Sequence, residues 1–476
     1  MYNAMRNVFK AANLHRLATT SHSGTSWNIF WGDHLKAAEY AALGPHQRVN
    51  HFPGSFELGR KDRLCRNLLR FRKKHPDAYA DVIPETYVTA NEYDKQQFLQ
   101  QYAANPRTLW ILKPPNLSCG RGIKIVAAST TPALKLTKKK AYVAQRYVAN
   151  PFLIHELKFD LRIYVVVTSY DPLRIYLFND GLVRFCTEKY STSKAGLQNQ
   201  FGHLTNYSVN KKNDAAFQPN DDREEEDGDL SSSKWSLQSF YKYVTEQGKV
   251  QELSTFKEAL NDLIVKTFIA VESKILMQTP ATGGAHSSGF ELYGFDILLE
   301  GEEMKPWLLE VNVFPSLSSS SPMDKRIKTM LVSDLFQLVG LPFQDAGAVA
   351  EQVERDKNDR LLGITRKTKK TSSETVEKSK RTRTVDELAT CKAALLTELD
   401  AVDLHIVQAL QEEDARRGHF ERIFPTADSW QKYGGLFETH RYKNVLCMRW
   451  LKTLQQHPVR RRSASASTHQ RRRPAS

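Results

Sequence analysis

The sequence predicts a mixed α/β (α+β) protein, and three patterns in its 476 residues indicate this class. Short apolar segments that fit strands are interspersed with segments of helical periodicity. Residues 291–299 and 306–314 are apolar and flank a polar connection that contains a Gly, which predicts a β-hairpin. Residues 251–276 carry apolar side chains at helical spacing. A chain of this length is expected to hold two or three domains.

The composition of the chain indicates which binding partners and which cellular compartment to expect. A hydrophobic content of 41% and 25% charged residues fit a soluble protein, whereas the net charge of +15 favours polyanions such as nucleic acid, anionic lipid or acidic protein tails. The five cysteines are scattered without a CxxC pair, which argues against a disulfide framework or a zinc site and favours a reducing compartment. No apolar run approaches the roughly 18 residues of a membrane span, and the N-terminus lacks the apolar core of a signal peptide.

The first third of the chain predicts a small α/β unit followed by paired strands. Residues 50–76 begin as a turn and continue as a helix whose basic face fits either solvent exposure or docking. A helix at 91–103 precedes strands at 108–113 and 122–128. The connection between these strands contains Pro and Gly, so its N–H groups could lie against a phosphate, with Lys113 adding charge. A plain hairpin explains the same residues.

Charged and apolar residues alternate at the start of the next long apolar segment. Lys158, Asp160 and Arg162 share one face of the expected strand, because side chains alternate along a strand. Residues 179–181 then predict a turn into a further strand that carries Arg184. A buried row of alternating charges is costly unless the groups meet a ligand or one another. A ligand site and an internal salt-bridge ladder both fit.

The hairpin carries a second group of polar residues. Folding it about Glu303, with a five-residue connection, places Asp296 opposite Glu310, and Asn312 lies on the same face as Glu310. Two opposed carboxylates inside apolar strands repel each other and resist burial unless a cation binds. Two acids and an amide oxygen, without His or Cys, fit Mg2+. A solvent-facing polar stripe is the alternative.

The composition of the remaining segments predicts their structure. His203 lies in a polar turn, where a structural hydrogen-bonding role fits better than acid–base catalysis. Residues 220–233 are acidic, lack apolar residues and predict a disordered insertion. Further helices are expected at 234–247 and 322–339, and a long one at 386–418 that ends at a Gly.

Four blocks in order carry a resemblance to a known family. They are NHFPGSFELGRKDRL, ILKPP…GRGIKIV, KFDLRIYVVV…DGLVRF…HLTNYS and GFDILLEGEEMKPWLLEVN. Together they resemble the tubulin tyrosine ligase-like family of ATP-grasp carboxylate–amine ligases, over about residues 25–345. Within it the chain is most similar to the polyglutamylases of the type 4 subgroup.

The resemblance implies an ATP-grasp fold and, with the composition, sets the expected domains. These are an N-terminal α/β domain (1–90), a central ATP-grasp lobe with the phosphate-binding Gly loop (91–152), a C-terminal ATP-grasp lobe with the Mg/ATP site (153–345), a basic linker (346–385) whose residues 366–383 could bind microtubules, a helical extension (386–454) and a disordered Arg/Ser-rich tail (455–476).

The resemblance also implies roles for particular residues. ATP would be bound by Lys113, Arg121, Gly122, Ile123, Gln145, Arg146, Tyr147, Val148, Lys158, Asp160 and Asn206. The catalytic residues would be Lys158, Asp160, Arg162 and Arg184. Substrate would be contacted by Arg162, Arg184 and Asn312, with Arg184 on the carboxylate of the incoming amino acid. Mg2+ would be coordinated by Asp296, Glu310 and Asn312.

The implied activity is ATP- and Mg-dependent tubulin polyglutamylation. A glutamate side chain in an acidic tubulin C-terminal tail would be phosphorylated to an acylphosphate, which the amine of free L-glutamate attacks to form an isopeptide bond. No nucleophilic side chain is needed, so positioning and charge neutralisation would suffice. Family members tend to have other residues at Cys119 and Val313; apolar Val313 favours chain initiation, whereas Cys119 leaves initiation or elongation open.

Other functions remain open at this point. Tubulin glycylation, tyrosine ligation and catalytically silent microtubule binding all fit the family, and a glutamate site needs a second cation that the sequence does not place. Nucleic-acid binding lacks an RNP, zinc-finger or helix-turn-helix signature, so neither specific nucleic acid nor membrane is an expected partner. We expect a monomer in the cytoplasm on the microtubule cytoskeleton, with a cilium or flagellum as a further location.

Overall fold

The computed structural model describes the chain except residues 1, 15–26, 45, 118, 138–140, 194, 214–232, 280–287, 342–353, 356–357, 359–360, 362–383, 391–398 and 457–476. The acidic insertion expected at 220–233, apart from Ser233, and the basic segment 366–383 lie outside the described residues. So does the expected tail, apart from its first two residues.

A large antiparallel sheet forms the centre of the molecule. Its strands run in the order β10-β9-β8-β11-β12, with β13 beside β9 and β7 beside β8. Their bounds are β7 (Leu153–Ile154), β8 (Leu157–Tyr170), β9 (Leu173–Lys189), β10 (Lys234–Ser236), β11 (Glu291–Glu300), β12 (Lys305–Asn312) and β13 (Phe420–Phe424). Both faces of the sheet are covered, which explains why these strands read as continuous apolar runs rather than as alternating ones.

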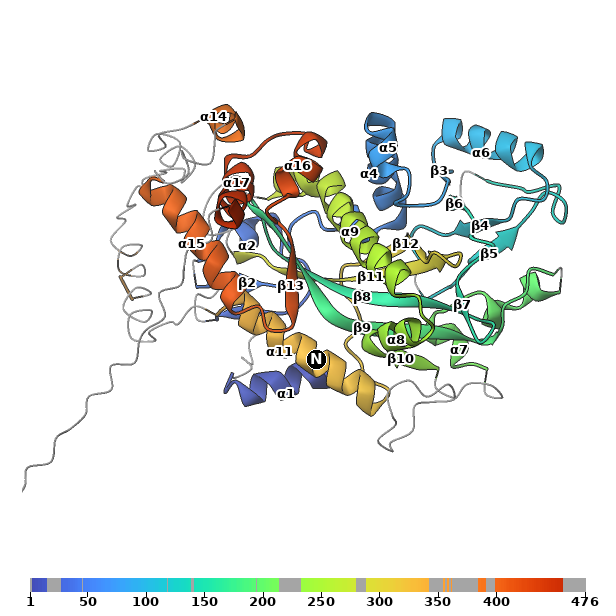
Figure 1. Ribbon diagram of the computed structural model, residues 1–476, viewed down its shortest axis with the longest axis horizontal. Coiled ribbons are helices and arrows are strands. Elements are labelled where there is room, and N and C mark those ends of the chain that lie inside the picture. Colours follow the sequence, from blue (N-terminus) through green and yellow to red (C-terminus); the bar gives the residue numbers. More distant parts are fainter. Residues whose placement is uncertain are drawn as a thin grey trace, which may run out of the picture.

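Helices pack on both faces of this sheet (Figure 1). Odd-numbered residues of β8, such as Ile163 and Val165, share a core with α8 (Leu237–Glu246) and α9 (Val250–Gln278). Even-numbered residues, such as Val166, pack with α1 (Asn3–Ala11) and α11 (Pro322–Val339). The charged positions of β8 therefore continue the face that α11 covers.

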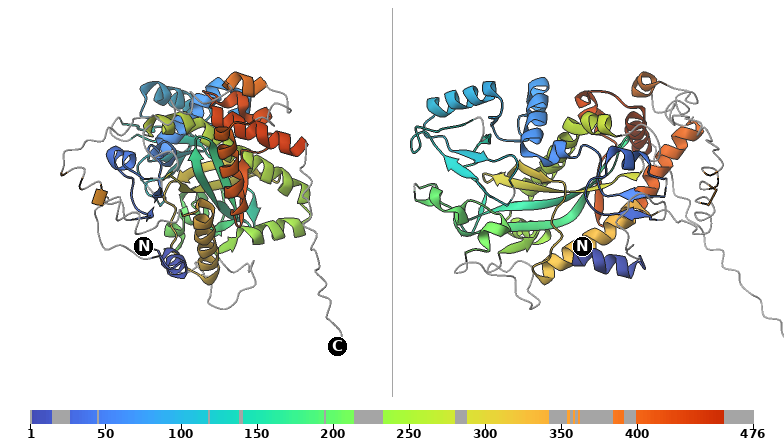
Figure 2. Two further views of the ribbon diagram at one scale, coloured as in Figure 1. Left: turned by 90° about the vertical axis from the view of Figure 1, so that its left-hand side faces the viewer. Right: turned by 180° about the vertical axis from the view of Figure 1, so that it is seen from behind.

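A smaller sheet lies beside the large one. Its antiparallel order is β3-β6-β4-β5. The bounds are β3 (Thr86–Val88), β4 (Trp110–Lys113), β5 (Lys124–Val126) and β6 (Val143–Arg146), and α6 (Glu92–Ala104) packs its aromatic residues against Trp110. In Figures 1 and 2 this sheet and α6 lie at one end of the long axis, and α15 (Ala401–Ala415) and α17 (Tyr442–Gln456) lie at the other.

Short elements connect these parts. The N-terminal region contains β1 (Ile29–Phe30), α2 (Ala37–Ala41), β2 (Arg48–Val49), α3 (Phe56–Gly59), α4 (Lys61–Lys74) and α5 (Pro76–Tyr79). Further along are η1 (Gly196–Gln198), η2 (Gln200–Gly202), α7 (Tyr207–Asn210), α14 (Val385–Thr390), α16 (Ser429–Tyr433) and η4 (Gly434–Leu436). The mixed helix-and-sheet architecture confirms the predicted fold class. The domain boundaries remain predictions, although β3, before residue 90, pairs with β6.

The turn predicted at 179–181 is wrong, because β9 runs through these residues. The reversal lies at 171–172 instead, between β8 and β9. The Asn-Asp-Gly signal marks a bulge, where the register moves from Ile163↔Gly181 to Val165↔Leu177. A Cβ at Gly181 would lie 2.5 Å from the carbonyl oxygen of Arg162, so the glycine permits close strand contact rather than a turn.

Two predicted helices also have different bounds. The helix expected at 234–247 starts only at Leu237, because Ser236 ends β10 and accepts a hydrogen bond from Ser239 N as the N-cap. The single helix expected at 386–418 is wrong, because Asp400 caps a separate helix, α15, through Val402 N and Asp403 N. The helices at 91–103, 251–276 and 322–339 are confirmed within two residues.

The C-terminal extension contributes to the main core. β13 pairs with β9, and Phe424 is fully buried against the α9 side of the sheet. A membrane-crossing helix is absent from the described part of the chain, since none of its helices combines the necessary length and apolarity.

Candidate functional site

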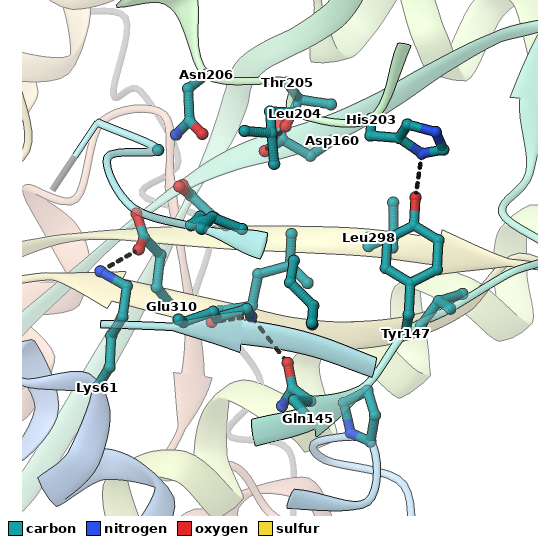
Figure 3. Close-up of a pocket in the computed structure, with 18 of the residues that line it drawn as sticks. Lys61, Gln145, Tyr147, Asp160, His203, Leu204, Thr205, Asn206, Leu298 and Glu310 are labelled. Atoms are coloured by element: carbon teal, nitrogen blue, oxygen red, sulfur yellow. Dashed lines mark hydrogen bonds and ion pairs between the residues drawn. The ribbon is translucent and has the colours of Figure 1, made fainter. Parts of the chain in front are cut away.

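A cavity of about 820 Å³, including its open mouth, separates the small sheet from the large one. β4 and β6 form one wall, and β8, β11 and β12 the other (Figure 3). Predicted site residues that line it are Lys113, Arg121, Ile123, Gln145, Arg146, Tyr147, Val148, Lys158, Asp160, Asn206, Asp296 and Glu310. Residues from four distant segments of the chain thus meet in one place, and the binding roles that the resemblance implies for them stay predictions.

Two buried lysines face each other across this cavity. Lys113 on β4 donates to Gln145 Oε1 at 2.8 Å, and Lys158 on β8 donates to Tyr147 OH at 2.8 Å. Within the described chain, neither ammonium has a carboxylate at ion-pair distance. Burial lowers the pKa of each lysine to about 8. Two desolvated cations that lack carboxylate partners favour the binding of a polyanion between them.

One part of the cavity is an apolar slot. It is lined by Pro84, Ile111, Val148, Leu298 and Leu309. The slot lies between the two sheets, and the side chains of Gln145 and Arg146 from β6 line the same cavity. A flat aromatic ring with polar edges, such as a purine, fits a site of this composition.

The loop between β4 and β5 approaches the cavity with an unusual backbone. Cys119, Gly120 and Gly122 have φ values of 61°, 72° and 72°, in the left-handed region where consecutive N–H groups can converge on an anion. Gly120, Arg121 and Ile123 line the cavity. Gly122 was expected there but does not line it; a Cβ at this position would lie 3.1 Å from the Pro114 side chain and 3.4 Å from that of Leu117.

A hydrogen-bond chain orients Lys158. Its acceptor, Tyr147 OH, lies 2.7 Å from His203 Nδ1, and His203 Nε2 lies 3.1 Å from the carbonyl oxygen of Gly196. Since a carbonyl can only accept, Nε2 carries the proton and Nδ1 accepts from the tyrosine. Burial lowers the pKa of His203 to about 4, so the ring is neutral near pH 7. This confirms the structural role predicted for His203.

An ion-pair network crosses the main sheet beside the cavity. Arg184 binds Asp160 through two hydrogen bonds of 2.7 and 2.6 Å, and Arg162 binds Asp296 through bonds of 2.6 and 3.1 Å. Arg184 also lies 3.0 Å from Asp296 and so links the two pairs. Thr205 donates to Asp160 at 2.6 Å. The internal ladder considered from the sequence is therefore present, and Lys158 lies outside it.

The hairpin has the predicted pairing but a different turn. Asp296 is the register partner of Glu310, as expected. The connection is the four-residue segment 301–304 rather than five residues, and a bulge after Asp296 restores the register. Glu303, one of its two middle residues, is exposed.

Cations of the protein balance the opposed carboxylates. Burial alone would raise the pKa of Asp296, but Arg162 and Arg184 outweigh it and hold the pKa well below its usual range. Lys61 Nζ lies 2.8 Å from Glu310 Oε2 (Figure 3). The charge conflict for which the sequence suggested a bound cation is thus met by arginine and lysine, and Mg2+ coordination by Asp296, Glu310 and Asn312 stays a prediction.

A second, larger cleft adjoins the first. Four residues line both: Lys61, Leu117, Asn206 and Glu310. Arg162, Arg184 and Asn312 line only the second cleft. The predicted nucleotide residues and the predicted substrate residues therefore occupy adjoining cavities that meet at Glu310.

Several residues of the site were not predicted. The sequence places Lys61 only on a basic helix face, Thr205 only in the polar turn around His203, and Lys234 only at the start of an expected helix. Their roles depend on contacts between segments far apart in the chain, such as Lys61 with Glu310. The matching block GRKDRL, which contains Lys61, was the available signal for that residue.

The sequence profile of the Tubulin-tyrosine ligase family matches residues 38–347 of this chain. Similar curated proteins include the human "Tubulin monoglutamylase TTLL4", 38% identical over 437 residues, which cover 90% of this chain and 35% of the relative. The mouse "Tubulin polyglutamylase TTLL5" is 35% identical over 449 residues, 93% of this chain and 32% of the relative. "Tubulin polyglutamylase ttll-4" of Caenorhabditis elegans is 34% identical over 428 residues, 88% and 66%. The chain thus spans about a third of the length of the mammalian relatives.

Proposed function

The chain belongs to the tubulin-tyrosine ligase family, and from this premise we propose that it is a tubulin polyglutamylase, an ATP- and Mg-dependent protein–glutamic acid ligase. It joins the amine of free L-glutamate to the side-chain carboxylate of glutamates in the acidic C-terminal tails of tubulin. The relatives named as tubulin mono- and polyglutamylases support this substrate.

The pair of buried lysines carries the proposal. Lys113 and Lys158 lie on opposite walls of one cavity, lack carboxylate partners among the described residues and adjoin an apolar slot. A nucleotide triphosphate matches both features, with its ring in the slot and its phosphates between the ammonium groups. A catalytically silent microtubule-binding protein would not need these costly buried charges.

The hairpin residues fit a magnesium ion by their donor set. Asn312 donates from Nδ2 to Gly294 O at 3.3 Å, which leaves its Oδ1 as a ligand atom. Glu310 is partly exposed, and its partner Lys61 can move aside because a lysine side chain is flexible. Oxygen ligands at the junction of the two cavities are what Mg2+ would bind next to phosphate.

When bound, Mg-ATP supplies the phosphoryl group that activates the acceptor carboxylate as an acylphosphate. Lys113 and Lys158 hold negative charge in place, and the chain from Lys158 to His203 fixes the ammonium position. Arg162 and Arg184, held by Asp296 and Asp160, present guanidinium groups at the second cleft, where the carboxylate of the incoming amino acid would bind. Catalysis then rests on orientation and charge neutralisation.

Mass spectrometry of tubulin tails tests this function. Purified protein, Mg-ATP and tubulin are incubated with equal glutamate, glycine and tyrosine, and the tail peptides are analysed. We expect glutamate additions on internal glutamates of the tails. Additions of glycine or tyrosine instead would support the two rival ligases, and no addition would support the catalytically silent alternative.

We further propose that the chain initiates glutamate branches. The apolar Val313 packs against Gly59 at the rim of the second cleft, and one relative is named a monoglutamylase. Single additions at several sites would support initiation, and long chains would support elongation. The proposed location is the microtubule cytoskeleton, including cilia or flagella, and the proposed state is a monomer.

A further inference from the structure

Three exposed apolar side chains lie at the mouth of the second cleft. Phe56 of α3, Leu117 in the loop between β4 and β5, and Phe314 after β12 are 46%, 42% and 43% exposed, and all three line this cleft. Among the residues that the structure describes, eight large apolar side chains are exposed. Three of these eight gather around one cleft, whereas scattered exposed side chains would need no explanation. We call the three the apolar rim.

Stacked rings hold the two aromatic members of the apolar rim in place. Phe56 stacks on His34 with ring centroids 4.4 Å apart, and His34 stacks on His51 at 4.1 Å. Phe314 contacts the ring of His51 at 5.5 Å. Both aromatic rings thus rest on one pair of imidazoles. Rings that are already held in this way lose little conformational entropy when a ligand covers them.

A buried carboxylate anchors the pair of imidazoles. Glu291 is fully buried, accepts a hydrogen bond from Phe52 N at 3.1 Å and lies 2.6 Å from His51 Nδ1. His34 Nε2 lies 2.6 Å from Ser55 Oγ. Each imidazole therefore has a fixed polar partner, and the two exposed rings of the apolar rim are supported from below by a rigid network.

Cations border the apolar rim. Arg60 and Arg63 line the same cleft, and the side chain of each is 40% exposed. Their carboxylate partners, Asp62 and Glu57, are only 9% and 13% exposed, so the cations rather than the anions face the solvent. A ligand that is acidic and carries an apolar side chain complements this surface, because it matches both the charge and the rim.

The apolar rim also adjoins the point where the acceptor carboxylate would be activated. Lys61 Nζ lies 2.8 Å from Glu310 Oε2 (Figure 3). It also donates to the carbonyl oxygen of Leu117 at 3.2 Å, and all three residues line both cavities. One residue of extended chain spans only about 3.3–3.6 Å. A peptide whose glutamate reaches Glu310 therefore places the next one or two residues close to Leu117.

We propose that the apolar rim binds an apolar side chain next to the modified glutamate, so that the protein selects acidic acceptor peptides with an apolar residue within one or two positions of that glutamate. This rests on the proposed function and narrows its acceptor. Arg60 and Arg63 attract the acidic flanks of the peptide. The apolar rim determines which glutamate along the peptide is modified.

Paired acceptor peptides test the apolar rim. Two synthetic peptides of glutamate and glycine differ only beside one internal glutamate, where one peptide has Phe and the other has Ser. We expect kcat/KM for glutamate addition to be about 10-fold higher for the Phe peptide, because its ring is buried on binding. Leu117→Ser and Phe314→Ser should each lower this ratio by about threefold or more. The ratio cancels any general loss of activity in a variant.

The matched control is Met277→Ser, because Met277 is 82% exposed and lines neither cavity. Its peptide ratio should equal that of the wild type. Phe314→Leu should keep most of the ratio, since it keeps an apolar side chain. Equal kcat/KM for both peptides in the wild type, or a ratio that survives in the folded Leu117→Ser, Phe314→Ser double variant, would overturn the proposal. If Phe314→Ser fails to fold in thermal unfolding, Leu117→Ser decides alone.

Binding without ligation separates this proposal from the proposed function. Fluorescence anisotropy of the two labelled peptides, with ADP and without free glutamate, measures the apolar rim alone. A Phe314-dependent preference for the Phe peptide in a protein that ligates nothing would support the rim and refute the ligase. A ligase that binds and modifies both peptides equally would do the reverse. Sedimentation velocity tests a second copy of the chain as the occupant: a dimer that Phe314→Ser dissociates would make the rim a subunit interface and overturn the proposal.

Discussion

At the scale of residues, the charges of the site divide into two kinds. Arg162 and Arg184 are tied to carboxylates by paired hydrogen bonds, whereas Lys113 and Lys158 make only neutral hydrogen bonds among the residues that the structure describes. The sequence predicted that Lys158, Asp160 and Arg162 share a strand face, because that follows from the two-residue period. It could not predict which of these charges would be paired, because their partners come from other strands.

Nucleotide affinity should therefore depend on pH. The pKa values of Lys113 and Lys158 are lowered to about 8, so both lysines lose charge in the free protein as pH rises above 8, whereas bound phosphate requires them charged. Binding must then take up protons. We expect ATP affinity to be nearly constant below pH 7 and to fall above pH 8 by about tenfold per pH unit for each reprotonated lysine.

Isothermal titration with ATP from pH 6.5 to pH 9.5 measures this dependence. ATP is itself fully ionised above pH 8, so the decline comes from the protein. The Lys158→Met variant should bind ATP more weakly at pH 7 and show a shallower decline. A flat profile in the wild-type protein would contradict the assignment of these lysines to phosphate.

At the scale of elements, register was predictable and bulges were not. The symmetric apolar runs of the hairpin set Asp296 opposite Glu310, because a shift by one residue would turn every apolar side chain out of the core. The four-residue length of the connection could not be predicted, because the hydrophobic pattern of the hairpin does not show the bulge that compensates for the missing residue. In β9, likewise, a glycine that permits close contact between strands was read as a turn.

A substitution at Gly181 should show whether this glycine permits close contact between β8 and β9 or forms a turn. In Gly181→Ala, the new Cβ would meet the carbonyl oxygen of Arg162 at 2.5 Å, so β8 and β9 must separate. We expect a loss of about 1–3 kcal/mol in the free energy of unfolding. Gly435→Ala, whose Cβ would meet nothing within 4 Å, is the control. Denaturant unfolding measures both, and equal stabilities would argue that β9 is not continuous here.

At the scale of the whole molecule, the fold brings the two sheets together around the nucleotide cavity. The residues on its walls come from segments between Lys61 and Glu310, and no local pattern in the sequence specifies how the sheets face each other. The predicted helical extension also differs from expectation, because β13 joins the main sheet and Phe424 lies in its core. Removing the entire C-terminal region would therefore damage the fold itself.

Microtubule binding is better tested within the basic segment 366–383, which carries eight Lys and Arg against two Glu. We expect replacement of these eight residues by Gln to weaken co-sedimentation with microtubules at low salt and to reduce the effect of added salt, because fewer ions are released on binding. Microtubules whose acidic tails have been removed by protease serve as the control. Unchanged affinity at low salt would exclude this segment as a docking site.

The central claim is that the protein uses ATP to ligate glutamate where the two cavities meet at Glu310 of the hairpin. Measuring both reaction products in the same assay tests it most directly. Radiolabelled glutamate in tubulin and released ADP are measured together for the wild type, Glu310→Gln and Glu303→Gln, the last altering an exposed carboxylate of the same hairpin. We predict about one ADP per glutamate added, a loss of at least about 100-fold in Glu310→Gln, and wild-type activity in Glu303→Gln. Glutamate added without ADP release, or full activity in Glu310→Gln, would contradict it.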